Sequence, residues 1–284
     1  MNIFEELGYY LQFSFVQYAL IVGVLISLCC AILGVTLVLK RYAMIGDGLS
    51  HVAFGAMTFA MVLTIADMYL MLPVTIVVAI LLVRLTNKGK VKNDTAIAML
   101  SVGALALGYL VINLFSSSAN VASDVCSTLF GSISILTLGT FDVWLCVILT
   151  IIVLAFFIVF HNKIFSVTFD EDFSNATGTK SAVYNNIMAV IIGVIIVLAM
   201  KLVGSLLISA LIVFPAISAF RLFKSYKMVI IFAGIVGVFN SVIGILTSML
   251  WGTPIGATIV AIDILVYLIC WCLEIILRGT KKVK

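Results

Sequence analysis

The sequence predicts an all-α bundle of membrane-spanning helices. Of its 284 residues, 64% are hydrophobic and only 10% are charged, whereas soluble domains carry about 45–50% apolar and about 25% charged residues. The apolar residues form long unbroken runs, which excludes a β-barrel, because barrel strands alternate in segments of ~10 residues. This composition excludes a soluble enzyme, a disordered chain and a nucleic-acid-binding protein. It predicts one integral membrane domain over residues 1–284, with the lipid bilayer as its solvent.

Nine apolar runs approach or exceed the ~20 residues that a spanning helix needs. They are 15–39, 44–66, 69–84, 95–115, 141–160, 185–201, 203–220, 228–250 and 255–277. The pair least clearly separated is the sixth and seventh, because only Lys201 and Gly204 interrupt that run. Eight spans with a re-entrant element are the alternative. The loop 116–128 is polar but nearly uncharged, and the run FGSISILTLG (130–139) after it is short and flanked by glycines. A re-entrant or interfacial turn is expected there.

The basic residues predict the orientation of the spans. With nine alternating spans, all of them except Lys201 fall on one side of the membrane. They are Lys40, Arg41, Arg84, Lys88, Lys90, Lys92, Lys163, Lys180, Arg221, Lys224, Lys227, Arg278, Lys281, Lys282 and Lys284. Because Lys and Arg mark the cytoplasmic side, the N-terminus is predicted outside and the C-terminus inside. Residues 1–14 contain no Lys or Arg, so no cleavable signal peptide is expected.

One sizeable polar connection, residues 166–186, is predicted to lie on the cytoplasmic side. Asp170, Glu171 and Asp172 precede Ser174, which is expected to cap a short helix. Two interpretations remain open from composition alone. The segment is either a solvated loop or a docking element for a cytoplasmic partner.

Asp47 and His51 are the strongest candidates for a site inside the membrane. Charged side chains within a span are costly and therefore suggest function, and a spacing of four residues places both on one helix face. A carboxylate and an imidazole together suit Zn²⁺, Mn²⁺ or Fe²⁺. Two ligands do not close a coordination shell, so waters or a second copy of the helix would have to complete it. The alternative is a polar pair, hydrogen-bonded within the bundle.

Three other residues within the spans are weaker candidates. Asp263 is expected to pair with a hydroxyl or backbone group in the bundle rather than to serve transport. Pro215 should kink its span and free a carbonyl. Gly204 and Pro215 are therefore candidates for a hinge or gate.

Catalytic motifs are absent from the sequence, so no enzymatic activity is expected. No phosphate-binding GxxxxGK[ST] is present, since the string Gly178-Thr179-Lys180-Ser181 lacks the upstream glycine, and neither HExxH nor GxSxG occurs. Energy for uphill transport would have to come from an ion gradient or from another subunit.

Five segments, in order, resemble the membrane permeases of bacterial metal-ion ABC importers. They are LGVTLVLKRYAMIGDGLSHVAFGA (33–56), SDVCSTLFGSI (123–133), the polar segment with Asp172 and Gly178, MKLVGSLLISALIVFPAISAFRL (200–222) and TPIGATIV (253–260). Two positions depart from the family pattern: Ser132 stands where an Asp or Asn is frequent, and Asp263 stands where an acid is unusual.

The resemblance implies a homodimer of permeases in the bacterial plasma membrane, served by two cytoplasmic ATPases that bind ATP and by an external metal-binding protein. It also implies that Asp47 and His51 line the translocation path, and that the segment with Asp170, Glu171, Asp172 and Gly178 contacts the ATPase. The expected function is ATP-driven import of zinc or manganese, or else of iron. The rivals are a secondary transporter or channel without an ATPase, a permease for a metal chelate, and a structural membrane subunit.

Overall fold

The computed structural model describes residues 3–87, 93–115 and 139–281, and the regular structure of these residues is entirely helical. The helices are α1 (Ile3–Tyr10), α2 (Ser14–Leu39), α3 (Ile45–Val62), α4 (Asp67–Asn87), α5 (Asn93–Phe115), α7 (Thr140–Val159), α8 (His161–Phe169), α9 (Glu171–Ala176), α10 (Ser181–Val203), α11 (Ser205–Leu222), α12 (Tyr226–Trp251) and α13 (Ile255–Lys281). The predicted all-α fold is confirmed.

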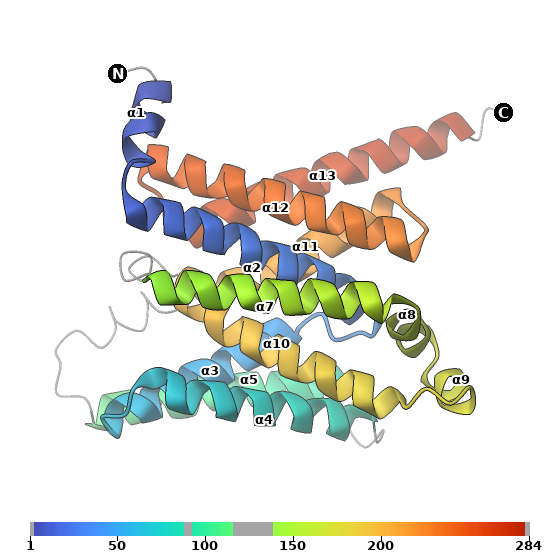
Figure 1. The fold of residues 1–284 in the computed structure, drawn as a ribbon, viewed down its shortest axis with the longest axis horizontal. Helices are drawn as coiled ribbons and strands as arrows, with labels where there is room; N and C mark the ends of the chain where they lie inside the picture. The colour runs from blue at the N-terminus through green and yellow to red at the C-terminus, as the bar shows by residue number, and fades with distance from the viewer. Residues whose placement is uncertain (1–2, 88–92, 116–138, 282–284) are drawn as a thin grey trace.

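Each of the nine predicted spans corresponds to a separate helix. Among the described residues, eight helices are long and apolar enough to cross a membrane, and the apolar part of α11, Leu207–Leu222, is shorter. The N-terminus and the C-terminus lie at opposite ends of the bundle (Figure 1), as an odd number of passes requires. The turn predicted from the loop 116–128 and the run 130–139 lies, apart from Gly139, outside the described residues. The orientation in the membrane stays a prediction.

The helix α2 occupies the centre of one half of the bundle, where α7, α11 and α12 pack around it. Glycines permit close approach of the backbones at these contacts. A Cβ at Gly34 of α2 would collide with the backbone carbonyl of Ile212 in α11, and one at Gly237 of α12 would lie 2.8 Å from the Cβ of Ala31. These contacts hold α11 and α12 against α2.

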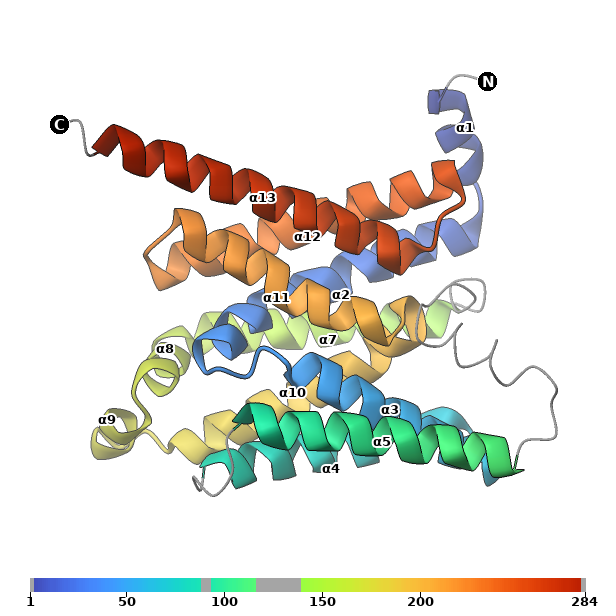
Figure 2. The ribbon, with the colours of Figure 1, turned by 180° about the vertical axis from the view of Figure 1, so that it is seen from behind.

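The other half is built around α3, which packs against α4, α5, α10 and α11. Its contact with α5 is glycine-lined on both sides. A Cβ at Gly55 would lie 3.1 Å from the carbonyl oxygen of Ala104, and a Cβ at Gly108 would lie 3.1 Å from the Cα of Gly55. The helix that carries Asp47 and His51 is therefore held tightly to α5 (Figure 2).

Gly204 separates α10 from α11. Its φ of +82° lies in a region that glycine enters without steric cost, so the chain can end one helix and begin the next at a single buried residue. The helix α11 continues through Pro215 to Leu222, although the proline cannot donate a hydrogen bond to the carbonyl one turn earlier. A gating role for either residue stays a prediction.

Candidate functional site

Asp47 and His51 lie in the first two turns of α3, on the same face as predicted. Asp47 Oδ1 is 3.5 Å from His51 Nε2, and the side chains are 28% and 13% exposed, respectively. Asp47 is in the first turn of the helix, where a negative charge is favourable next to the free N–H groups of the helix start. The dyad is therefore compatible with the helix and is only partly enclosed by its neighbours.

The other contacts of the dyad are few. Ser101 of α5 donates a hydrogen bond of 3.3 Å from Oγ to Asp47 Oδ2. Nδ1 of His51 is buried and has no hydrogen-bond partner among the described residues. O–H···O hydrogen bonds in proteins usually span 2.5–3.0 Å, so the bond from Ser101 is long, and each carboxylate oxygen keeps a lone pair for another partner.

The spacing of the two ligand atoms suits a shared metal ion. Bonds of about 2.1 Å from a tetrahedral metal to a carboxylate oxygen and an imidazole nitrogen would hold those atoms about 3.4 Å apart, and the observed distance is 3.5 Å. Within the described part of the chain, no group of three or more His, Cys, Asp or Glu side chains gathers around one point. One chain therefore offers two strong ligands here.

The polar connection is folded into two short helices, α8 and α9. The prediction that Ser174 caps α9 was wrong. The cap is Asp170, whose Oδ1 accepts a hydrogen bond of 2.9 Å from the N–H of Phe173. Ser174 is buried inside α9 and bonds the hydroxyl of Ser166 at 2.6 Å, which ties α9 to α8.

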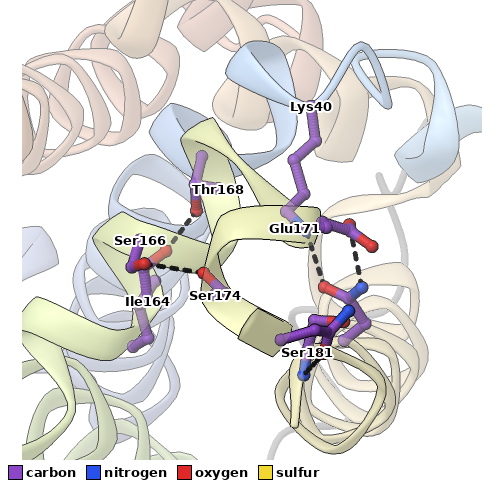
Figure 3. A network of polar contacts seen from close by, with 9 residues as sticks. Lys40, Ile164, Ser166, Thr168, Glu171, Ser174 and Ser181 are labelled. Atoms are coloured by element: carbon purple, nitrogen blue, oxygen red, sulfur yellow. Dashed lines mark hydrogen bonds and ion pairs between the residues drawn. The ribbon is translucent and has the colours of Figure 1, made fainter. Parts of the chain in front are cut away.

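A charged network joins this pair of helices to the membrane bundle (Figure 3). Lys40, just after α2, donates from Nζ to Glu171 Oε1 at 2.8 Å and to Asn185 Oδ1 at 2.6 Å, and Asn185 Nδ2 donates to the same Glu171 oxygen at 3.0 Å. Burial lowers the pKa of the Lys40 ammonium, while the hydrogen bond and charge of Glu171 act against that shift. The network thus connects α9 to the chain that leads into α3.

The remaining residues predicted for docking are on the surface. Asp172 and Gly178 are exposed, and Gly178 ends the turn after α9 with a φ of +87°. Three phenylalanines of the same two helices, Phe165, Phe169 and Phe173, are also exposed. This combination of apolar rings and an acid at the end of the bundle gives α8 and α9 the character of an interaction surface.

Asp263 has a different environment. It is 0% exposed, and its Oδ1 accepts a hydrogen bond of 2.6 Å from Asn240 Nδ2 of α12. Asp263 thus has a polar partner in the bundle, but the expectation of a hydroxyl or backbone group was wrong, because the partner is a side-chain amide. Glu274 is likewise buried and pairs with Arg221 at 3.2 Å.

Three contributors were missed at the level of sequence. The sequence marks Lys40 as an indicator of orientation and as part of the motif shared with the metal-ion permeases, but not as a partner of the polar connection, and it does not single out Ser101 or Asn185. The signal that could have identified Ser101 is its polar hydroxyl within an apolar run. Lys40 and Glu171 are 131 positions apart in the sequence, so no local sequence pattern predicts that they pair.

Comparison with known proteins places the chain in a family. The model of the ABC 3 transport family matches residues 12–274. The manganese import system permease protein ScaB of Streptococcus gordonii is 27% identical over 258 residues, which are 91% of each chain. The high-affinity zinc uptake system membrane protein ZnuB of Haemophilus influenzae is 28% identical over 242 residues, covering 85% of this chain and 91% of that protein.

A solved structure agrees with these matches. PsaBC from Streptococcus pneumoniae in complex with Fab contains a chain that superposes with a TM-score of 0.81 at 25% identity, and the match covers 95% of both chains. The family match spans nearly the whole bundle and includes both α3 and the α8–α9 pair. The chain is a multi-pass membrane protein that belongs to the ABC 3 transport family.

Proposed function

We propose that the chain is the permease subunit of an ABC importer for a divalent transition metal, which passes the ion along Asp47 and His51. The observation that carries this proposal is the spacing of the two ligand atoms, 3.5 Å, with only weak competing contacts around them. The printed names of the relatives, which concern manganese and zinc, support the class of cargo. A site with oxygen and nitrogen ligands and no thiolate can bind such ions and still release them.

The coordination shell requires further ligands, because one chain supplies two. A homodimer with α3 of both protomers near the two-fold axis would bring together two Asp and two His side chains. Closed two-fold dimers are the commonest symmetric assembly. Bound waters could complete the remaining positions.

The energy for transport enters at α8 and α9. We assign the exposed face with Phe165, Phe169, Phe173 and Asp172 to a cytoplasmic ATPase subunit, which binds and hydrolyses the ATP. The network of Lys40, Glu171 and Asn185 then links α9 to the segment before α3. The external metal-binding protein docks at the opposite end, where α1 lies.

The test is metal-resolved uptake by cells that express the permease with its ATPase and its binding protein. Asp47→Ala and His51→Ala should each lower accumulation at least tenfold at equal expression, whereas Met61→Ala, an exposed residue of the same helix, should behave as wild type. Parallel measurements with Mn²⁺, Zn²⁺ and Fe²⁺ identify the cargo, because oxygen and nitrogen ligands suit all three. Normal uptake by the two site variants would refute the site.

Two further measurements separate the rivals. Liposomes that hold this chain alone should show no metal flux, and flux without the ATPase would indicate a secondary transporter or channel. Uptake of a metal chelate, but not of the free ion, would favour the chelate permease.

A further inference from the structure

An apolar groove of about 890 Å³ lies between α2, α7 and α12. Leu28 and Ile32 of α2 line it together with side chains of α7 and α12. Gly234 of α12 also lines it, and a Cβ there would come within 3.2 Å of the Leu28 side chain. The missing side chain at this glycine keeps the groove deep.

The groove is long as well as apolar. On α12 its lining runs from Lys227 to Val242 with helical spacing, which is roughly 22 Å along the helix axis. That length exceeds one leaflet of a hydrocarbon core about 30 Å thick. Ile235 and Phe239, which lie along it, are exposed, so the groove opens outward from the bundle and suits an extended hydrocarbon chain.

The groove is charged at one end only. Lys227 and His161 line it there, next to α8 and at the end predicted to be cytoplasmic. No acidic side chain among the described residues forms an ion pair with Lys227. Lys163 is turned elsewhere, since its Nζ lies over the rings of Phe160 and Tyr184. A cation at the mouth of an apolar groove complements an anionic headgroup with an acyl chain.

The groove also lies away from the proposed dimer contact. Figure 1 shows α7 and α12 on the side of the bundle that faces the viewer, whereas the view from behind in Figure 2 brings α5, α11 and α13 forward. The helix α3 packs against α5 and α11. A second protomer that approaches α3 from that side leaves the groove facing lipid.

We propose that this groove is a binding site for an anionic glycerophospholipid. One acyl chain lies along α12 between α2 and α7, and the phosphate is held by Lys227 beside His161. Basic pockets between transmembrane helices at the cytoplasmic side bind anionic headgroups.

The test uses the purified permease in nanodiscs of equimolar phosphatidylglycerol and phosphatidylcholine, followed by native mass spectrometry of the lipids retained on release. The wild type should retain phosphatidylglycerol preferentially. Lys227→Gln should lower that preference about fivefold, as expected for one lysine at the lipid surface. Lys224→Gln, an exposed lysine of the same end that does not line the groove, should leave the preference unchanged.

A second pair of variants tests whether an acyl chain occupies the groove. Val238→Trp fills the groove and should lower retention of phosphatidylglycerol, whereas Ile148→Trp, at an exposed position of α7 outside the groove, should not. The proposal is overturned if Lys227→Gln matches Lys224→Gln, or if Val238→Trp retains as much lipid as Ile148→Trp. A change of oligomeric mass in Val238→Trp alone would also overturn it, and would assign the groove to a second copy of the chain.

Discussion

Two acids inside the bundle, Asp47 and Asp263, differ in access and in the strength of their contacts. Asp47 is partly exposed and has two long contacts, of 3.5 Å with His51 and 3.3 Å with Ser101. Asp263 is fully buried and has one short contact, of 2.6 Å with Asn240. A carboxylate that an ion can reach, beside a second ligand, can take part in transport. A fully buried carboxylate such as Asp263 instead stabilises the contact between α12 and α13.

The difference between the two acids can be tested by neutralising each one without changing its shape. Asp47→Asn should reduce metal uptake at least tenfold, because an amide oxygen is a much weaker ligand than a carboxylate. Asp263→Asn should keep uptake within about twofold, because its amide oxygen can still accept from Asn240. Uptake of the metal, normalised to permease in the membrane, measures both. Equal losses would mean that Asp263 also serves the path.

Replacing each acid by alanine should destabilise the protein more at Asp263 than at Asp47, the reverse of the order expected for uptake. Asp263→Ala leaves the buried Asn240 amide without its acceptor, which costs about 1–3 kcal/mol of stability. Asp47→Ala should cost less than about 1 kcal/mol, because its contacts are long and water can reach the site. Unfolding of the purified variants in detergent provides the measurement. A greater loss in Asp47→Ala would contradict the assignment of Asp263 to packing.

The close packing of α3 against α5 can be tested at Gly48, which is next to Asp47. A Cβ at Gly48 would lie 2.8 Å from Ile97 Cγ2 of α5, so Gly48→Ala should cost about 1 kcal/mol through overpacking and displace Ser101 from Asp47. Gly103→Ala, on α5 with nothing within 4 Å of the added Cβ, should be neutral or stabilising. Unfolding and metal uptake, measured on both variants, should separate them. Identical behaviour would show that α3 and α5 are not tightly coupled.

The sequence predicted what depends on composition and on local spacing. Long apolar runs located all nine main helices, and the spacing of four residues placed Asp47 and His51 on one face, because both properties belong to single segments. The partners of Asp263 and Lys40 were not predictable in this way, since Asn240 and Glu171 reach them only through the packing of distant helices. Ser174 was assigned the cap because any of several short polar residues can cap a helix, and the backbone selects Asp170.

The smallest expected effect concerns the link between α9 and the bundle. Lys40 is 12% exposed and bonds both Glu171 and Asn185. Lys40→Met should therefore cost about 1 kcal/mol and lower uptake about two- to threefold, since α9 would no longer be tied to the segment that leads into α3.

The matched control is Lys224→Met, at an exposed lysine between α11 and α12, which should alter neither quantity. A double-mutant cycle with Glu171→Gln isolates the pair itself, and contacting residues of this kind couple by about 0.5–3 kcal/mol. A coupling near zero, with normal uptake in Lys40→Met, would show that this pair does not link α9 to α3. In that case the ATPase would have to act on the dyad through α10, which packs against both α3 and α9.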